Sequence, residues 1–283
     1  MHFKTHIIGS NGFVGRNLVK KFEKTSTEVF SINRTNCVLV SSSSINYLKE
    51  NISNGDEIIF ISAIAPCRNL EDFSLNITMM KNFIEGVKEI ELSSILYLSS
   101  DAVYAKSITK IDEGSEVAIS NYHSGMHLMR EFMVHKEIKS KRKIVVRPTS
   151  IFGVDDPHKS YGPNQFLDSV KSGNEIQIHG LGEEIREHIH INDVCELLYL
   201  INLKGDSGIY NLSSGIPISF NEVAQKIIHR FPNISIKYGK RLSEIDDPIR
   251  IYSVEKIREL HPLLNFESLD SYLDRIKDEV PKC

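Results

Sequence analysis

The sequence lacks the features that mark several special classes of protein. Lys and Arg total 34 and Asp and Glu total 37, which gives a formal net charge of −3, so no excess of positive charge favours nucleic acid or an acidic membrane surface. No apolar run approaches the length of about 20 residues that spans a bilayer, and no basic, apolar leader precedes the first predicted strand. We therefore expect a cytoplasmic protein that binds neither nucleic acid nor membrane.

Cysteine is also scarce in this chain. The four cysteines are scattered and form no C-x-x-C pair: Cys37, Cys67, Cys195 and Cys283. This usage suits buried thiols in a reducing compartment rather than a disulfide framework.

The most informative stretch is GSNGFVG at residues 9–15, which lies between a predicted buried strand over 5–8 and an amphipathic helix. Such a turn presents backbone N–H groups at the positive end of a helix dipole, where a diphosphate binds. Gly9 and Gly12 leave no Cβ to hold a diphosphate away, and Gly15 lets the helix pack close to the strand. The predicted dinucleotide-binding residues here are Gly9, Asn11, Gly12, Phe13, Val14 and Gly15.

The next two strand ends bear on the identity of the dinucleotide. A carboxylate after the second strand would bond the adenosine ribose and repel a 2′-phosphate, but this chain has Asn33 and Arg34 there. A guanidinium can pair with that phosphate, so NADP is slightly favoured over NAD; the simpler alternative is that Arg34 is a solvated loop charge. After the strand over 57–62, Ala63, Ile64 and Ala65 are suited to lie along the dinucleotide.

The order of predicted elements indicates an α/β fold with a doubly wound parallel sheet. Strands and helices alternate through the first half of the chain. The strand over 95–98 ends in Ser99, Ser100 and Asp101, where hydroxyl groups would lie in the ligand crevice. From residue 155 the composition shifts, and residues 209–212 are predicted to return to the main sheet.

With these pieces in place, the chain resembles the extended short-chain dehydrogenase/reductase family of nucleotide-sugar epimerases, dehydratases and reductases. The resemblance covers nearly the whole chain. It implies a Rossmann-type NAD(P)-binding domain over 1–153, with a returning strand near 208–213, and a smaller domain, mostly 154–283, that binds a nucleoside-diphosphate sugar. Its motifs are GSNGFVG at 9–15, ISAIAP at 61–66, LSSDAVY at 98–104, Tyr122, RPTSIFG at 147–153, GLGEEIREHIHINDV at 180–194 and YNLSSG at 210–215.

The resemblance implies that Tyr122 and Ser100 handle a proton at a sugar oxygen while the nicotinamide exchanges hydride at the same carbon. A tyrosine titrates near pH 10, so a nearby cation must lower its pKa. The family supplies a lysine four residues later, but this chain has Met126. Three explanations remain open: an engineered Lys→Met substitution, a natural variant whose cation comes from elsewhere, and a protein that binds its ligands without turnover. His127 is an alternative proton carrier.

The residues after Ser100 bear on the type of reaction. Dehydratases of the family carry an Asp-Glu pair here, whereas this chain has Asp101 followed by Ala102, which disfavours elimination. Hydride transfer at C4 then leaves a 4-epimerase or a 4-ketoreductase, and Asn33 with Arg34 favours the reductase slightly. A ring isomerase that uses the cofactor transiently is a further outcome.

The resemblance also assigns contacts outside the catalytic group. Arg186 fits the position whose guanidinium clamps the substrate diphosphate, Arg250 is a second candidate, and Asn164 matches a sugar-phosphate contact. Related enzymes often dimerise through two long helices, here near 74–90 and 122–138, so we expect a homodimer. Further cofactor contacts are assigned to Ser99, Tyr122, Met126 and Pro148.

Two groups of residues have spacings that formally suit a metal ion. His123, His127 and Glu131 share one helical face, and His188 and His190 lie on the same side of a strand. A solvated helix face is the simpler interpretation of the first group, and family members carry aromatic or histidine residues without a metal in the second. We expect no metal site.

Overall fold

The computed structural model describes residues 4–278, apart from residues 26, 108, 155, 158, 160 and 242–246. A six-stranded parallel sheet runs through its centre in the order β2-β1-β3-β4-β5-β9, which confirms the predicted fold class. The returning strand near 208–213 is β9, which pairs with β5. The strand bounds are β1 (Thr5–Ile8), β2 (Val29–Ile32), β3 (Glu57–Phe60), β4 (Leu92–Leu98), β5 (Ser140–Pro148) and β9 (Gly208–Leu212).

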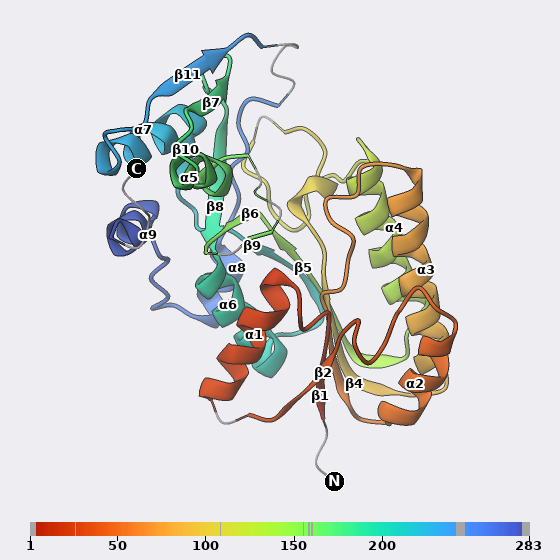
Figure 1. The fold of residues 1–283 in the computed structure, drawn as a ribbon. Helices are drawn as coiled ribbons and strands as arrows, with labels where there is room; N and C mark the ends of the chain where they lie inside the picture. Colours follow the sequence, from red (N-terminus) through yellow and green to blue (C-terminus); the bar gives the residue numbers. More distant parts are fainter. Residues whose placement is uncertain are drawn as a thin grey trace.

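Helices cover both faces of this sheet (Figure 1). Alternate strand residues point to opposite faces of the sheet. On one face, Ile7 packs in a core with α1 (Phe13–Lys24) and α6 (Ile191–Lys204). On the other face, Ile8 packs in a second core with α2 (Ser43–Asn51), α3 (Leu70–Val87) and α4 (Tyr122–Glu137). A short helix, α8 (Glu255–Leu260), adds Ile257 to the first core.

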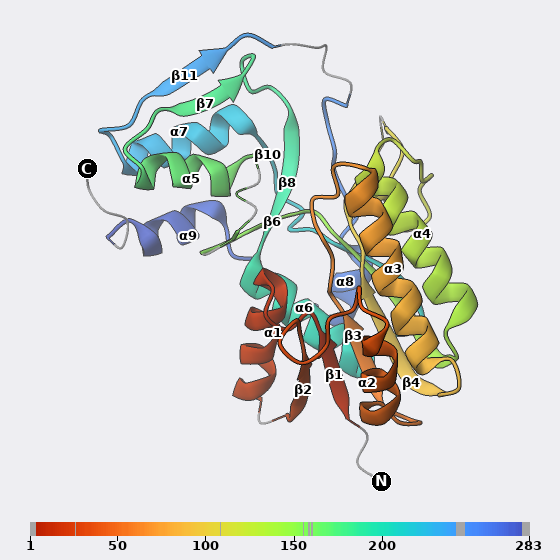
Figure 2. The same ribbon diagram turned by 45° about the vertical axis from the view of Figure 1, so that its right-hand side comes forward.

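A smaller unit lies beyond the carboxyl edge of the sheet (Figure 2). It has a three-stranded sheet in the order β10-β8-β6 and a two-stranded sheet of β11 and β7. Its helices share a third core, and Ser219 and Glu222 form the predicted capping box of α7. The elements are β6 (Ser150–Phe152), α5 (Pro163–Lys171), β7 (Ile176–His179), β8 (Ile185–His190), β10 (Pro217–Ser219), α7 (Phe220–Arg230), β11 (Ile236–Gly239) and α9 (Leu269–Ile276).

Two of the sequence expectations concern the chain as a whole. Cys37, Cys67 and Cys195 are buried free thiols, while Cys283 lies outside the described residues. None of the described helices combines the length and the apolar composition needed to cross a bilayer.

Candidate active site

The glycine turn joins β1 to α1 in a tightly packed conformation. Gly9 has φ +98°, and a Cβ there would lie 2.7 Å from the backbone nitrogen of Ser62. A Cβ on Gly15 would lie 2.1 Å from the carbonyl oxygen of Gly9, which explains the close packing expected at this position. Gly12 is the N-cap of α1, and neither a side-chain cap nor an acidic residue occupies the first turn. The backbone N–H groups at the start of α1 can therefore donate hydrogen bonds to a bound anion.

The other residues predicted at this turn differ in what they can contribute. The side chains of Phe13 and Val14 are buried in the core beneath the turn, so only their backbone groups face a ligand. Asn11 is exposed. The turn therefore offers backbone donors and one amide side chain.

The end of β2 carries Asn33 and Arg34 as predicted. The Asn33 amide donates to the Ser10 hydroxyl at 3.2 Å and accepts from the backbone N–H of Thr35 at 3.0 Å. Arg34 is exposed, and no described residue pairs with its guanidinium. This cation is thus available to a ligand phosphate beside the glycine turn.

The segment after β3 is clamped to α3. The buried Asn76 side chain accepts from the backbone N–H of Ile64 at 3.0 Å and donates to its carbonyl at 2.9 Å. Ala63 and Ala65 are half-buried. Because Gly9 packs against Ser62, this segment continues the crevice that the glycine turn begins.

The two serines after β4 have different surroundings. Ser99 is buried and donates to the Glu131 carboxylate at 2.5 Å, and Glu131 also receives two hydrogen bonds from Arg147 at 3.0 and 2.6 Å. The Ser100 hydroxyl accepts from the backbone N–H of Ala102 at 3.2 Å and is half-buried at the sheet edge. The sequence did not predict the Glu131–Arg147 pair. Because the Ser99 hydroxyl donates to this paired carboxylate, Ser99 has a structural role.

Asp101 contacts Arg250, one of the two arginines predicted for the diphosphate. Arg250 donates to the carbonyl of Asp101 at 3.0 Å and pairs with the Asp247 carboxylate at 3.2 Å, while Arg186 donates to the Asp247 carbonyl at 2.8 Å. The Tyr252 hydroxyl donates to the Asp101 carboxylate at 2.7 Å. Burial lowers the pKa of Arg186, and the charge of Arg250 lowers it further. The fold therefore brings the guanidinium groups of Arg186 and Arg250 together at Asp247, with that of Arg250 beside Asp101.

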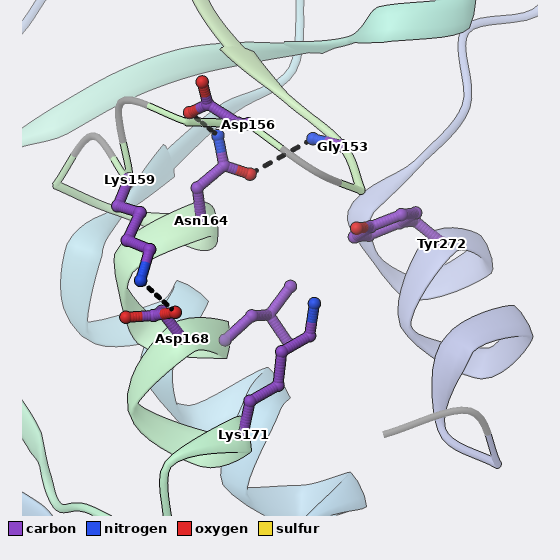
Figure 3. A pocket seen from close by; sticks show the side chains of 8 residues that line it. Gly153, Asp156, Lys159, Asn164, Asp168, Lys171 and Tyr272 are labelled. Atoms are coloured by element: carbon purple, nitrogen blue, oxygen red, sulfur yellow. Dashed lines mark hydrogen bonds and ion pairs between the residues drawn. The ribbon is translucent and has the colours of Figure 1, made fainter. Parts of the chain in front are cut away.

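Asn164 and Pro148 are both held by local contacts. Asn164, at the start of α5, accepts from the backbone N–H of Gly153 at 3.1 Å and donates to the Asp156 carboxylate at 2.6 Å. It lines a cavity of about 170 Å³ between α5 and α9, into which Lys171 and Tyr272 also project (Figure 3). Pro148 is buried at the end of β5. No hydrogen bond among the described residues joins Asn164 to the arginine pair.

Tyr122 opens α4 as predicted, and its side chain packs near Phe73 of α3. It is 46% exposed, and its ring centroid is 6.4 Å from that of Phe73 on α3. None of the described residues, Ser100 included, hydrogen-bonds its hydroxyl. The structure thus brings Tyr122 to the same end of the sheet as Ser100 without bonding the two.

Met126 is fully buried and packs against a cation that the sequence did not reveal. A guanidinium nitrogen of Arg130 lies 3.8 Å from the Met126 sulfur, and Arg130 is itself fully buried. Arg130 donates to the Ser62 carbonyl at 2.9 Å and lies over the rings of Phe60 and Tyr97 at 5.0 and 5.5 Å. Its charge would have predicted a surface position.

Two histidines occupy the side of α4 that faces the sheet. Nδ1 of the buried His127 lies 2.7 Å from the Tyr97 hydroxyl, and burial holds the pKa of His127 well below 6.5. Nδ1 of His123 accepts from the backbone N–H of Cys67 at 3.3 Å. Glu131 is paired with Arg147 and does not join them, and the described part of the chain holds no cluster of three His, Cys, Asp or Glu side chains suited to a metal ion.

Comparisons with known proteins identify the family of the chain. Residues 5–213 match the NAD dependent epimerase/dehydratase family. The chain is 26% identical to a dTDP-D-glucose 4,6-dehydratase of Dictyostelium discoideum over 275 residues, covering 82% of this chain and 62% of that protein. It is 27% identical to an ADP-L-glycero-D-manno-heptose-6-epimerase of Brachyspira hyodysenteriae over 179 residues, covering 56% of this chain and 55% of that protein. The chain thus spans roughly half to three fifths of these relatives.

Solved structures share the fold over nearly the whole chain. A UDP-glucose 4-epimerase of Thermotoga maritima with UDP-glucose superposes with a TM-score of 0.81 at 15% identity, covering 99% of this chain and 100% of that chain. RMD of Pseudomonas aeruginosa complexed with NADPH superposes with a TM-score of 0.83 at 15% identity, covering 98% of each chain.

Proposed function

The chain belongs to the NAD dependent epimerase/dehydratase family, and on that premise we propose that it modifies a nucleoside-diphosphate sugar by hydride transfer at C4, as a 4-epimerase or a 4-ketoreductase. The observation that carries the proposal is the pair Arg186 and Arg250, bonded around Asp247 and next to Asp101. Two guanidinium groups at one edge suit a diphosphate, which accepts bidentate hydrogen bonds.

The residues of the glycine turn fit a nicotinamide dinucleotide. A Cβ at Gly9 or Gly15 would collide with neighbouring backbone atoms, so the tight turn requires glycine at both positions. Helix α1 begins without a side-chain cap. When bound, the dinucleotide would supply or remove the hydride. In this proposal Arg34 is the cation that pairs with a 2′-phosphate, and on that ground we favour NADP over NAD.

The proton at the sugar oxygen belongs in this proposal to Tyr122 and Ser100. Ser100 is half-buried at the edge where Asp101 meets Arg250, so its hydroxyl can orient the reacting oxygen. Tyr122 lies on the first turn of α4, and its half-exposed side chain can exchange its proton with solvent.

We propose that the two units of the chain bind different ligands. Residues 1–153 with β9 bind the dinucleotide, and residues 154–283 mostly bind the nucleotide sugar.

We also propose that the protein works as a homodimer in the cytoplasm, with α3 and α4 of each copy in the interface. In support, these helices carry exposed apolar side chains: Leu70, Met129 and Phe132.

Met126 favours a second candidate function. Without a lysine at this position the chain would hold a dinucleotide and a nucleotide sugar but not convert them, as a regulatory binding protein. The buried contact of Met126 with Arg130 shows that the position is well packed rather than vacant, which is compatible with either function.

The decisive experiment identifies the bound molecules and then the reaction. We would measure by mass spectrometry the small molecules released on denaturation, and then assay UDP-, dTDP- and GDP-hexoses and their 4-keto forms with NADP(H) and NAD(H). We expect a nicotinamide dinucleotide to be bound and C4 to be epimerised or reduced. Binding of both ligands without turnover would establish the second candidate, and no dinucleotide binding by calorimetry would refute both.

A matched pair of variants tests the arginine site. Arg186→Met should weaken nucleotide-sugar binding at least ~10-fold, because a hydrogen-bonded charge pair contributes about 1.5–3 kcal/mol, and should leave dinucleotide affinity unchanged. The control is Arg241→Met, which removes a partly buried arginine of the same unit that pairs with Glu183 and Glu184. Equal losses in both variants would argue against a diphosphate at Arg186.

A further inference from the structure

A fully buried guanidinium on α4 has no carboxylate to balance its charge. Arg130 is 0% exposed, donates to the Ser62 carbonyl at 2.9 Å and to the Asn76 side-chain oxygen at 3.4 Å, and has no partner for Nε among the described residues. Tyr97 and Cys67, rather than a carboxylate, are the groups that act on its pKa. Because buried charges in proteins are normally paired, this cation lacks a counter-charge.

The neighbouring groups leave this positive charge in place. Glu131 on the next position of α4 is paired with Arg147, and Asp72 in the first turn of α3 accepts from a backbone N–H at 2.9 Å. Burial holds the pKa of His127 well below 6.5, so its imidazole is neutral at pH 7. Met126 is fully buried against the guanidinium. Solvent therefore screens this charge far less than a charge at the surface.

The charge lies where β3 and β4 end. The guanidinium is 5.0 Å from the ring centroid of Phe60, the last residue of β3, and 5.5 Å from that of Tyr97, the residue before the last of β4. Ser62, whose carbonyl it bonds, packs against Gly9 of the dinucleotide turn. Ligands of parallel sheets bind at the carboxyl ends of the strands, so Arg130 places its charge at the ligand edge.

The strand order sets the direction of the proposed dinucleotide along this edge. The first four strands lie in the order β2-β1-β3-β4, with β2 at the edge of the sheet. In the proposed function the adenosine end lies by Arg34 after β2, and the diphosphate lies at the glycine turn after β1. The nicotinamide end then extends toward the ends of β3 and β4, which is where Arg130 lies.

Helical spacing brings the same charge toward Tyr122. Residues 122, 126 and 130 are four apart and share one side of α4. Side chains on a helix lean toward its N-terminus, and the Arg130 guanidinium accordingly reaches the Met126 sulfur, 3.8 Å away and one turn nearer Tyr122. The proposed proton donor and the buried cation are therefore on the same side of the helix.

We propose that Arg130 makes the site prefer a reduced nicotinamide dinucleotide over the oxidised form. This role rests on the proposed function. The oxidised nicotinamide ring carries a positive charge and the reduced ring carries none, so a buried cation at this end disfavours the oxidised complex. Arg130 acts through space and touches neither ligand, which makes it a specificity-determining residue. Because a 4-ketoreductase starts from the reduced dinucleotide and a 4-epimerase from the oxidised one, this preference favours the ketoreductase.

The ratio of two dissociation constants tests this preference without requiring turnover. NADPH and NADP⁺ share the diphosphate and the 2′-phosphate, so the contributions of the glycine turn and of Arg34 cancel in their ratio. Coulomb's law gives an effect of roughly 10-fold for two unit charges about 10 Å apart at an effective dielectric constant of about 20. By calorimetry, the wild-type protein should bind NADPH at least ~10-fold more tightly than NADP⁺.

Matched variants separate the charge from the packing. Arg130→Met should lower the ratio of the NADP⁺ to the NADPH dissociation constant about 10-fold, whereas Arg130→Lys keeps the charge and should hold the ratio within about threefold of wild type. Loss of a purely structural contact would weaken both dinucleotides equally. The control is Arg142→Met, because Arg142 pairs with Glu57 at the amino end of β3, and it should leave the ratio unchanged.

The outcomes distinguish this role from the proposed function. Equal binding of NADPH and NADP⁺ by the wild-type protein would overturn the inference, and so would an unchanged ratio in a folded Arg130→Met protein. Both results leave the proposed function intact. If Arg130→Met does not fold, as judged by urea unfolding, the wild-type and Arg130→Lys ratios decide. Binding of neither dinucleotide would instead refute the proposed function itself.

Discussion

The guanidinium of Arg130 lies 3.8 Å from the sulfur of Met126, and both side chains are fully buried. Arg130 is held by the Ser62 carbonyl and the Asn76 side chain, and its Nε has no hydrogen-bond partner among the described residues. A cation therefore already lies beside Met126, the position at which the resemblance predicts a lysine. Any change at residue 126 has to be considered together with this charge.

Met126→Lys should destabilise the protein. The new ammonium group would be buried beside a guanidinium of the same sign, and an uncompensated buried charge costs about 3–5 kcal/mol. Adding Arg130→Met to this variant should recover most of the free energy of unfolding, because a single buried cation then remains. Urea unfolding of the single and double variants provides the measurement. A stable Met126→Lys protein whose turnover rises by orders of magnitude would show instead that a native lysine had been replaced.

Gly15→Ala should disrupt the dinucleotide turn. Its Cβ would lie 2.1 Å from the carbonyl oxygen of Gly9, so the start of α1 must shift, and overpacking of this kind costs about 1–3 kcal/mol. We expect a lower free energy of unfolding and at least ~10-fold weaker NADP⁺ binding by calorimetry. Gly12→Ala is the matched control for stability, because its Cβ would meet only the Gly9 oxygen, at 3.3 Å. Equal stability of both variants would contradict the packing argument.

Acid should destabilise the protein in part through His188. This side chain is buried, neither ring nitrogen has a hydrogen-bond partner among the described residues, and burial lowers its pKa to about 4. Between pH 6.5 and pH 4 the unfolded chain therefore binds the proton more readily, and stability falls as pH falls, by about 1.4 kcal/mol per unit at most.

His188→Phe is the variant that isolates this effect. Phenylalanine fits the aromatic surroundings, since the Phe220 ring is 6.0 Å away, and it has no proton to bind. Denaturant unfolding at pH 7, 6, 5 and 4 should show a shallower loss of stability in the variant. His190, whose pKa burial also lowers to about 4, is present in both proteins and cancels in the comparison. Parallel stability curves would mean that His188 does not titrate as its burial implies.

Phe132→Glu should convert the proposed homodimer to a monomer. Phe132 is 57% exposed on the outward face of α4, and a buried carboxylate without a partner would oppose association. The measurement is molar mass by light scattering. Leu203→Glu is the control, because Leu203 is 53% exposed on α6, on the opposite face of the sheet, and should leave the mass unchanged. A monomeric wild-type protein at micromolar concentration would end the dimer proposal.

Much of the fold was predictable because local rules and the global arrangement agree. The spacing of Gly9, Gly12 and Gly15 indicated a strand, a turn and a helix, and the structure gives Gly9 and Gly15 a steric reason. The capping box of Ser219 and Glu222 marked the start of α7 correctly. These features depend on neighbouring residues alone, which a sequence displays directly.

The side-chain directions on α4 were less accessible. Apolar residues such as Met129 and Phe132 normally mark the buried face, yet here they are 45% and 57% exposed, while the charged Arg130 is buried. A sequence shows which residue opens the helix but not how the helix is rotated against α3. The contact of His123 with the backbone of Cys67 therefore required the structure.

Arg250 and Tyr252, which bond Asp101, follow the last strand of the central sheet in the sequence. The central sheet is complete once Leu212 has left the ribosome, whereas Arg250 emerges later. The nascent chain can thus form its dinucleotide turn against a finished sheet while the anion-binding edge is still missing. The proposed site for the sugar nucleotide is therefore completed only after the central sheet.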